Sequence, residues 1–135
     1  MTKKEQAPPK ILVVDDDESI VRLVEMLLTR RGLTVVKAGD GHEGFKMAIE
    51  HKPDAILLDV NMPGMDGFQL CSKLKATEKT AAIPVAFLTA RKEVESFRTA
   101  QDLGSLLYVP KPFKPEALVN AVGVLLAARG KKFPG

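Results

Sequence analysis

The chain is poor in the residues that form cross-links and transition-metal sites. Of its 135 residues, one is a cysteine and two are histidines, and tryptophan is absent. The single cysteine, Cys71, excludes a disulfide framework within the chain and a multi-cysteine zinc site. We expect Cys71 to be a small buried core residue. His42 and His51 leave little for a histidine-based site, and we expect both to be exposed on a helix.

Long apolar runs are also missing. No stretch approaches the roughly 20 apolar residues of a membrane-spanning helix, and the first ten residues lack the apolar core of a secretory signal. With 45% hydrophobic and 27% charged residues, the chain has enough apolar material for one domain core and is not a disordered segment. We therefore expect a soluble, cytoplasmic protein without a membrane partner.

The charge is unevenly distributed along the chain. A formal net charge of +3 suggests at first a nucleic-acid partner. However, residues 11–128 carry 14 basic and 16 acidic side chains, so the basic excess lies at the two ends. We expect a flexible N-terminal tail over residues 1–9, a folded domain over residues 10–129 and a basic C-terminal tail over residues 130–135. We expect no direct contact with nucleic acid, and we hypothesise that the basic ends assist docking on an acidic partner.

Short apolar runs alternate with segments of helical periodicity. The runs at residues 11–14, 33–36, 55–58, 84–88 and 106–109 predict five strands. The periodic segments predict five helices, of which the first covers about residues 19–31, the second 41–50 and the fourth 91–103. Strands joined through helices pair in parallel by right-handed crossovers. The pattern therefore predicts an α/β protein with a doubly wound, five-stranded parallel sheet and helices on both faces.

Polar residues stand where four of the predicted strands end. They are Asp15 and Asp16, then Asp59, Thr89 and Lys111. Ligands of such folds bind beyond the carboxyl ends of the strands, where these side chains meet. Each has an ordinary alternative role, since acids and threonine cap helices and a lone lysine is usually a surface residue. Their joint placement at successive strand ends favours a common site.

Three converging carboxylates repel each other unless a cation lies between them. Only oxygen ligands are available at this edge, and hard oxygen donors suit Mg²⁺. A carboxylate beside Mg²⁺ and a lysine can act as a nucleophile toward phosphorus, because both cations neutralise charge on the transferring oxygens. The hydroxyl of Thr89 can then donate a hydrogen bond to a phosphoryl oxygen. The residues thus predict an acyl phosphate on Asp59.

Four strings of residues, taken in order, resemble the receiver domain of two-component response regulators. They are Val13-Val14-Asp15-Asp16, Leu57-Leu58-Asp59-Val60-Asn61-Met62-Pro63-Gly64-Met65-Asp66-Gly67, Leu88-Thr89-Ala90 and Lys111-Pro112-Phe113. Each string alone is a weak signal, whereas the ordered set is specific. The resemblance covers about residues 10–129 and implies a flavodoxin-like sheet with strand order 2-1-3-4-5.

The resemblance also implies roles for the residues at the strand ends. A sensor histidine kinase or a histidine phosphotransfer protein would phosphorylate Asp59, and the domain itself would catalyse only its own phosphorylation and dephosphorylation. Asp16, Asp59 and the backbone carbonyl of Asn61 would ligate Mg²⁺, with Asp15 contributing through water. Lys111 would pair with the phosphoryl group. The peptide bond between Lys111 and Pro112 would be cis, which fixes the direction of the lysine.

A switch is implied as well. In similar receivers a hydroxyl at the position of Thr89 moves onto the phosphoryl group, and an aromatic at the position of Tyr108 rotates inward. The alternative for Tyr108 is an ordinary half-buried strand residue, but its place three residues before Lys111, where the family has its aromatic, favours the switch. The implied output is a changed surface on the fourth helix, fifth strand and fifth helix, read by a downstream effector protein. The chain would be a monomer or a weak phosphorylation-dependent dimer. Pro110 fits this fold if the fifth strand is a sheet edge.

Four functions compete. The leading one is a stand-alone receiver, because the resemblance takes up almost the whole chain; a receiver excised from a larger response regulator or hybrid kinase is the alternative. A Mg²⁺-dependent phosphatase needs a carboxylate two residues after its aspartate nucleophile, where this chain has Asn61. A phosphorylation-independent interaction domain would not need Asp59, Thr89 and Lys111 together.

Overall fold

The computed structural model describes residues 7–90 and 107–134. Five strands form one parallel sheet in the order β2-β1-β3-β4-β5, which confirms the expected topology. The expected helix over residues 91–103 lies outside the described residues, and the described part contains four helices. The elements are β1 Lys10–Val14, α1 Glu18–Thr29, β2 Thr34–Ala38, α2 Gly41–His51, β3 Ala55–Asp59, α3 Gly67–Lys75, β4 Val85–Ala90, β5 Leu107–Lys111 and α5 Pro115–Ala128.

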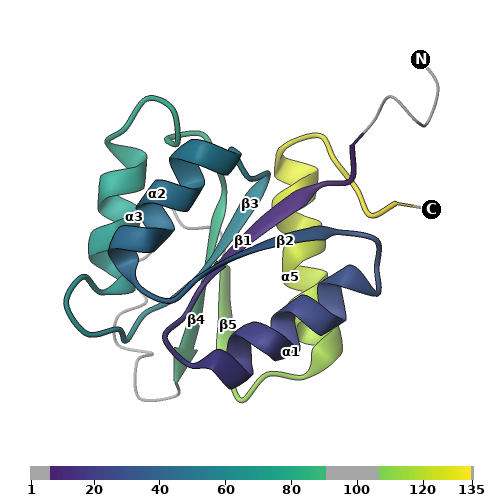
Figure 1. Ribbon diagram of the computed structural model, residues 1–135. Coiled ribbons are helices and arrows are strands. Elements are labelled where there is room, and N and C mark those ends of the chain that lie inside the picture. Colours follow the sequence, from purple (N-terminus) through teal and green to yellow (C-terminus); the bar gives the residue numbers. More distant parts are fainter. Residues whose placement is uncertain (1–6, 91–106, 135) are drawn as a thin grey trace.

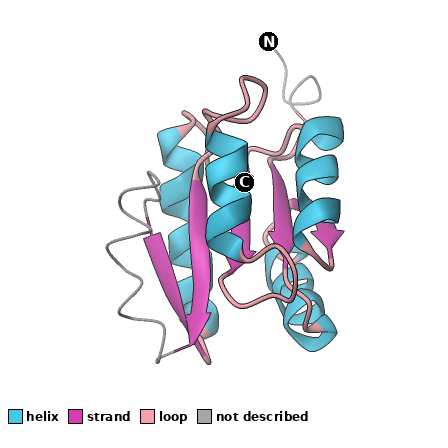
Figure 2. Cartoon of the chain, turned by 90° about the vertical axis from the view of Figure 1, so that its left-hand side faces the viewer, coloured by secondary structure: helices cyan, strands magenta, loops and turns pink. Residues whose placement is uncertain are grey.

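Helices cover both faces of the sheet (Figures 1 and 2). One face packs against α1 and α5, and the other packs against α2 and α3. Side chains alternate between these two cores along each strand. In β1, Ile11 and Val13 enter the first core while Leu12 and Val14 enter the second. This two-sided burial explains why the central strands are continuous apolar runs.

Three helices begin at aspartates near the carboxyl edge of the sheet. Asp17, Asp40 and Asp66 are the N-caps of α1, α2 and α3, and each side chain accepts a hydrogen bond from a backbone N–H of its own helix. Asp66 and Gln69 form a reciprocal capping box. The same edge therefore carries several acidic side chains with structural roles, so acidity alone does not identify the functional residues.

The strand β5 forms one edge of the sheet, as Pro110 predicted. Among the described strands it pairs with β4 alone, and Pro110 lies opposite Thr89. A proline cannot donate a ladder hydrogen bond, and an edge strand tolerates this because one of its sides has no partner strand. This pairing also fixes the position of Lys111, which lies opposite Ala90 at the carboxyl end of the strand.

The C-terminal segment, residues 129–134, packs against the domain. The ring of Phe133 lies under the guanidinium of Arg31 at 4.5 Å and contacts the core between α1 and α5. Pro134 packs on Gly32. This glycine lies in the connection after α1 and has a left-handed backbone conformation, with φ of 84°. The Lys131 ammonium lies 3.0 Å from the carboxylate of Asp54. The basic residues expected on a tail thus occupy defined positions.

The remaining expectations concern single residues. Cys71 is fully buried in the core beneath α2 and α3, whereas His42 and His51 are exposed. The peptide bond between Lys111 and Pro112 is cis. Within residues 7–90 and 107–134, no helix has the length and apolar character needed to cross a bilayer.

Candidate functional site

The parallel sheet brings the predicted residues to one edge. Asp15 directly follows β1, Asp59 is the last residue of β3, and Lys111 is the last residue of β5. In the ladder between β3 and β4, Asp59 lies opposite Leu88, so Thr89 is one residue beyond it. Four of the predicted residues thus come from four adjacent strands.

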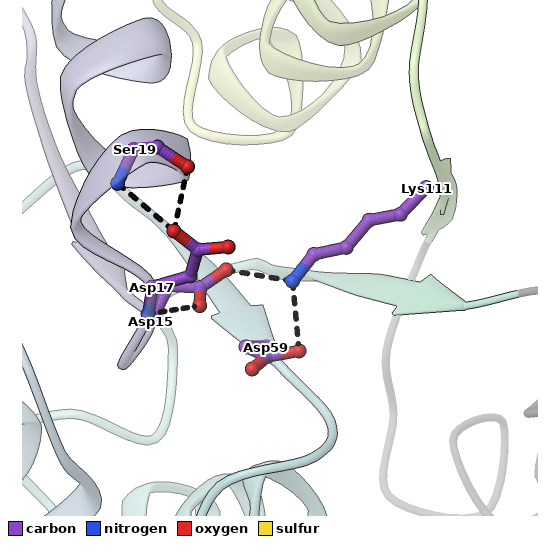
Figure 3. Close-up of polar contacts among 5 residues, drawn as sticks. All are labelled: Asp15, Asp17, Ser19, Asp59 and Lys111. Carbon is purple, nitrogen blue, oxygen red and sulfur yellow. Dashed lines mark hydrogen bonds and ion pairs between the residues drawn. The ribbon is translucent and has the colours of Figure 1, made fainter.

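Lys111 joins two of the carboxylates (Figure 3). Its ammonium lies 2.8 Å from Oδ2 of Asp15 and 3.1 Å from Oδ1 of Asp59. The residues Asp15 and Asp59 are 1% and 5% exposed, so both ion pairs are largely shielded from water. Charge-assisted hydrogen bonds of this kind are stronger than neutral ones and fix the direction of the lysine side chain.

The loop after β1 is held by its own aspartates. The backbone N–H of Asp17 donates to Oδ1 of Asp15 at 2.9 Å, and Ser19 donates to Oδ1 of Asp17 through both its N–H and its hydroxyl. The Ser19 hydroxyl bond, followed by the backbone bond, lowers the pKa of Asp17. Asp17 is therefore a structural cap, and Asp15 is positioned by this loop as well as by Lys111.

Asp15, Asp16 and Asp59 form a group that can hold a metal ion. One carboxylate oxygen from each lies within 4.8 Å of the others. Mg²⁺ binds oxygen at about 2.1 Å in an octahedron, so its opposite ligands are about 4.2 Å apart. The three carboxylates fit such an ion with small side-chain movements or with one ligand acting through water. Three carboxylates and one ammonium leave two negative charges, which a divalent cation would neutralise.

This group is open to solvent on one side. A cleft lined in part by Asp15, Asp16, Glu18 and Gly39 lies between the start of α1 and the connection after β2. Asp16 itself is exposed, in contrast to the other two carboxylates. The cleft offers an ion a route to Asp15 and Asp16, and a proposed metal site requires such a route.

Burial and the positive charge of Lys111 act in opposite directions on the pKa of Asp59. Burial, followed by the charge of Asp15, raises the pKa of Asp59 to about 6, while Lys111 and a hydrogen bond from the Asn61 backbone oppose this rise. Burial alone would lower the pKa of Lys111, but hydrogen bonds and charges from Asp15 and Asp59 outweigh it and raise that pKa. The ionised site is thus short of positive charge when no divalent cation is bound.

Replacing Asp59 by asparagine should stabilise the Mg²⁺-free protein at neutral pH. A folded-state pKa near 6, above the unfolded value, means that folding disfavours the ionised form. The wild type therefore loses stability as pH rises from about 4 through 6, and the neutral asparagine avoids this loss. We expect a gain on the order of 2 kcal/mol at pH 7.5 in urea denaturation, falling toward zero at pH 4. A gain that does not change with pH would contradict this origin.

The other predicted residues lie close to the same edge. Thr89 is buried in β4, and Asn61 is exposed in the loop after β3. Tyr108 is half-buried in β5, where its ring lies 6.0 Å from that of Phe87, and burial raises its pKa. This position agrees both with a switch and with an ordinary strand tyrosine, so the role of Tyr108 stays a prediction.

Gly67 is a site residue that sequence reasoning did not single out. A Cβ built at this position would collide with the backbone carbonyl of Asp59 and would lie 3.0 Å from Cα of Val60. The N–H of Gly67 also donates to the Val60 carbonyl at 3.0 Å. The first residue of α3 thus packs directly on the strand end that carries Asp59. In the sequence, Gly67 is the last residue of the string around Asp59 and immediately follows a helix cap, but it was given no role of its own.

The comparisons with known proteins agree with this geometry. The family described as response regulator receiver domain matches residues 11–123. The chain is 40% identical over 118 residues to the DNA-binding dual master transcriptional regulator RpaA of Synechocystis, covering 87% of this chain and 49% of that protein. It is 41% identical over 117 residues to the alkaline phosphatase synthesis transcriptional regulatory protein PhoP of Bacillus subtilis, covering 87% and 48%. The chain spans about half the length of these curated relatives.

Solved structures give the same result. A putative response regulator from Chloroflexus aurantiacus superposes with a TM-score of 0.84 at 33% identity, covering 89% of this chain and 98% of that one. The chemotaxis protein CheY4 of Vibrio cholerae superposes with a TM-score of 0.84 at 32% identity, covering 89% and 100%. The family match extends over most of the chain and includes the strand ends that carry Asp15, Asp59 and Thr89. The chain therefore belongs to the response regulator receiver domains of two-component signalling, whose members are regulatory phospho-acceptors.

Proposed function

We propose that Asp59 accepts a phosphoryl group from a histidine kinase or a histidine phosphotransfer protein. The observation that carries this proposal is the contact between the buried Asp59 carboxylate and the Lys111 ammonium at 3.1 Å. Asp15 binds the same ammonium from the side of β1. This contact holds Lys111 where it can form an ion pair with a phosphoryl oxygen on Asp59.

The proposed reaction exchanges one bond to phosphorus for another. A carboxylate oxygen of Asp59 attacks phosphorus, the phosphorus–nitrogen bond to the donor imidazole breaks, and the imidazole nitrogen takes up a proton. Bound Mg²⁺ would neutralise charge on the transferring oxygens. Asp16, Asp59 and the Asn61 carbonyl are its proposed direct ligands, with Asp15 acting through water. Hydrolysis of the acyl phosphate by water returns the free carboxylate.

We further propose that phosphorylation acts through Thr89 and Tyr108. Thr89 lies one residue beyond the partner of Asp59 in the ladder, and Tyr108 lies opposite Phe87 in the next strand. A hydroxyl that moves onto the phosphoryl group would leave space for the tyrosine ring. The proposed output surface comprises β5 and α5 together with the expected fourth helix, which lies outside the described residues. It would then change and be read by a downstream effector protein.

The proposed functional unit is a single receiver domain. We propose that the receiver domain over residues 10–129, with residues 130–134 packed against it, acts as a stand-alone cytoplasmic phospho-acceptor that is a monomer or a weak phosphorylation-dependent dimer. We propose that this domain itself does not contact nucleic acid, although its relatives include proteins named as DNA-binding and transcriptional regulators. A receiver that is part of a larger response regulator or hybrid kinase is the alternative.

Intact-mass measurement after incubation with Mg²⁺ and a phosphoramidate donor tests the central proposal. The wild type should gain one phosphoryl group, whereas Asp59→Asn should gain none, because the amide is not a nucleophile toward phosphorus. Asp40→Asn is a matched control, since Asp40 caps α2 and asparagine is an equally good cap. This control should be phosphorylated as the wild type is.

Three outcomes would contradict the proposal. They are a wild type without phosphate, an Asp59→Asn variant that gains phosphate equally well, and gain by the wild type when Mg²⁺ is chelated. Continuous release of phosphate from a generic phosphomonoester would point instead to an enzyme with an aspartyl-phosphate intermediate.

A further inference from the structure

The C-terminal segment brings together three connections at the amino-terminal edge of the sheet, opposite the carboxylates. Arg31 of the connection after α1 stacks on Phe133, and Asp54 of the connection after α2 pairs with Lys131. The Arg129 guanidinium donates to the carbonyl of Ala82, in the connection between α3 and β4, at 3.0 Å. The start of β1 and the C-terminal segment lie on the same side of the molecule (Figure 1). The C-terminal segment therefore fixes the positions of these three connections relative to one another.

Basic residues accumulate at this edge. The side chains of Arg30, Lys52, Lys79 and Lys132 are exposed, and within residues 7–90 and 107–134 no ion pair neutralises them. They come from the three connections and from the C-terminal segment. We call this set the basic pole. Part of its charge has a structural explanation, because cations at helix C-termini interact favourably with the helix dipole. That explanation does not extend to Lys132, which follows α5 on a separately anchored segment.

We propose that the basic pole binds an acidic segment of a partner protein. Four exposed cations attract carboxylates, and the backbone that carries them is already ordered before a partner binds. The carboxylate site lies at the opposite edge of the sheet, so a bound partner would leave Asp59 accessible. The pole is thus a second interaction surface, independent of phosphorylation.

The composition of the pole favours a protein over other polyanions. Exposed Glu50 and Glu78 lie in or beside the same connections and repel any anion. A peptide can place neutral residues opposite them, whereas a nucleic acid carries a phosphate at every nucleotide. An anionic bilayer is bound best when apolar side chains accompany the cations. Among the described residues, the large exposed hydrophobic side chains are Met26, one turn before Arg30 in α1, and Val124 within α5, so a single such side chain accompanies these cations.

Fluorescence anisotropy with a labelled peptide rich in glutamate and aspartate tests this proposal without any phosphodonor. The double variant Arg30→Glu/Lys132→Glu should weaken binding by roughly tenfold or more. The matched control Lys46→Glu/Lys114→Glu makes the same change in net charge at exposed positions away from the pole, and its affinity should stay within about twofold of the wild type. Phe133→Ala keeps every charge but releases the segment, so it should weaken binding several-fold while the domain stays folded.

Several results would overturn the proposal. An equal loss in the control pair would show that net charge, and not the pole, attracts the peptide. If Phe133→Ala binds the peptide with wild-type affinity, the anchoring of the C-terminal segment does not contribute to binding. Tighter binding of duplex DNA or of phosphatidylserine vesicles than of the peptide would assign the pole to those partners instead. Absence of peptide binding by the wild type would end the proposal, whatever the result at Asp59.

Discussion

Replacing Lys111 by methionine is expected to destabilise the Mg²⁺-free protein by about 3 kcal/mol near pH 8. The substitution keeps much of the side-chain length but removes the cation that lies between Asp15 and Asp59. Both carboxylates are almost completely buried, so their negative charges would face each other without compensation. Urea denaturation measures the effect, and Lys46→Met, at an exposed position of α2, should differ little from the wild type.

The pH dependence identifies the cause of this loss. Lys111 lowers the pKa of Asp59, so its removal raises that pKa further above 6. Near pH 5 Asp59 would be mainly protonated in both proteins, and the difference in stability should shrink. The double variant Lys111→Met/Asp59→Asn should recover much of the loss at pH 8, and millimolar Mg²⁺ should do so in the single variant. A loss that is equal at both pH values and is not recovered would assign Lys111 a packing role.

Replacing Gly67 by alanine should disrupt the strand end that carries Asp59. The new methyl group would overlap the Asp59 carbonyl, and backbone atoms cannot move away as a flexible side chain could. We expect a loss of about 3 kcal/mol in unfolding free energy. Because a displacement of about 1 Å can cost a hundredfold in rate, the initial rate of phosphorylation should fall by about that factor.

Gly39→Ala is the matched control for this prediction. Gly39 also lies beside the carboxylate group, but the nearest heavy atom to its added Cβ would be Oε1 of Glu43 at 3.8 Å. This is an ordinary van der Waals distance, so the stability should change by less than about 1 kcal/mol. Equal behaviour of the two alanine variants would show that the close approach of Gly67 to Asp59 has no effect on the site.

Much of the fold could be predicted because the strands of a doubly wound sheet are continuous apolar runs. The run of residues 55–58 differs from β3 by a single residue, since Asp59 itself completes the strand. The second strand was less well predicted: it covers Thr34–Ala38, whereas the apolar run ended at Val36. Lys37 and Ala38 extend it because backbone pairing with β1 continues beyond the apolar residues.

The candidate site was predictable in its members but not in all of its contacts. The position of each acid and of Lys111 after a strand follows from the order of the elements alone. The bond between Lys111 and Asp15 depends on a separation of 96 residues and on the exact register of β5, which no local pattern contains. The packing of Phe133 beside Gly123 could not be predicted either, because it depends on how α1 and α5 are arranged in space.

The two edges of the sheet limit how copies of this chain can associate. At one edge, Pro110 interrupts the row of backbone donors of β5, and at the other, β2 carries the exposed residues Thr34 and Lys37. Proline and lysine on edge strands disfavour the addition of a further strand from another molecule. Self-association through a continuous intermolecular sheet, including ordered aggregation, is therefore disfavoured. Association of two copies is expected to use side-chain contacts and not backbone pairing between sheet edges.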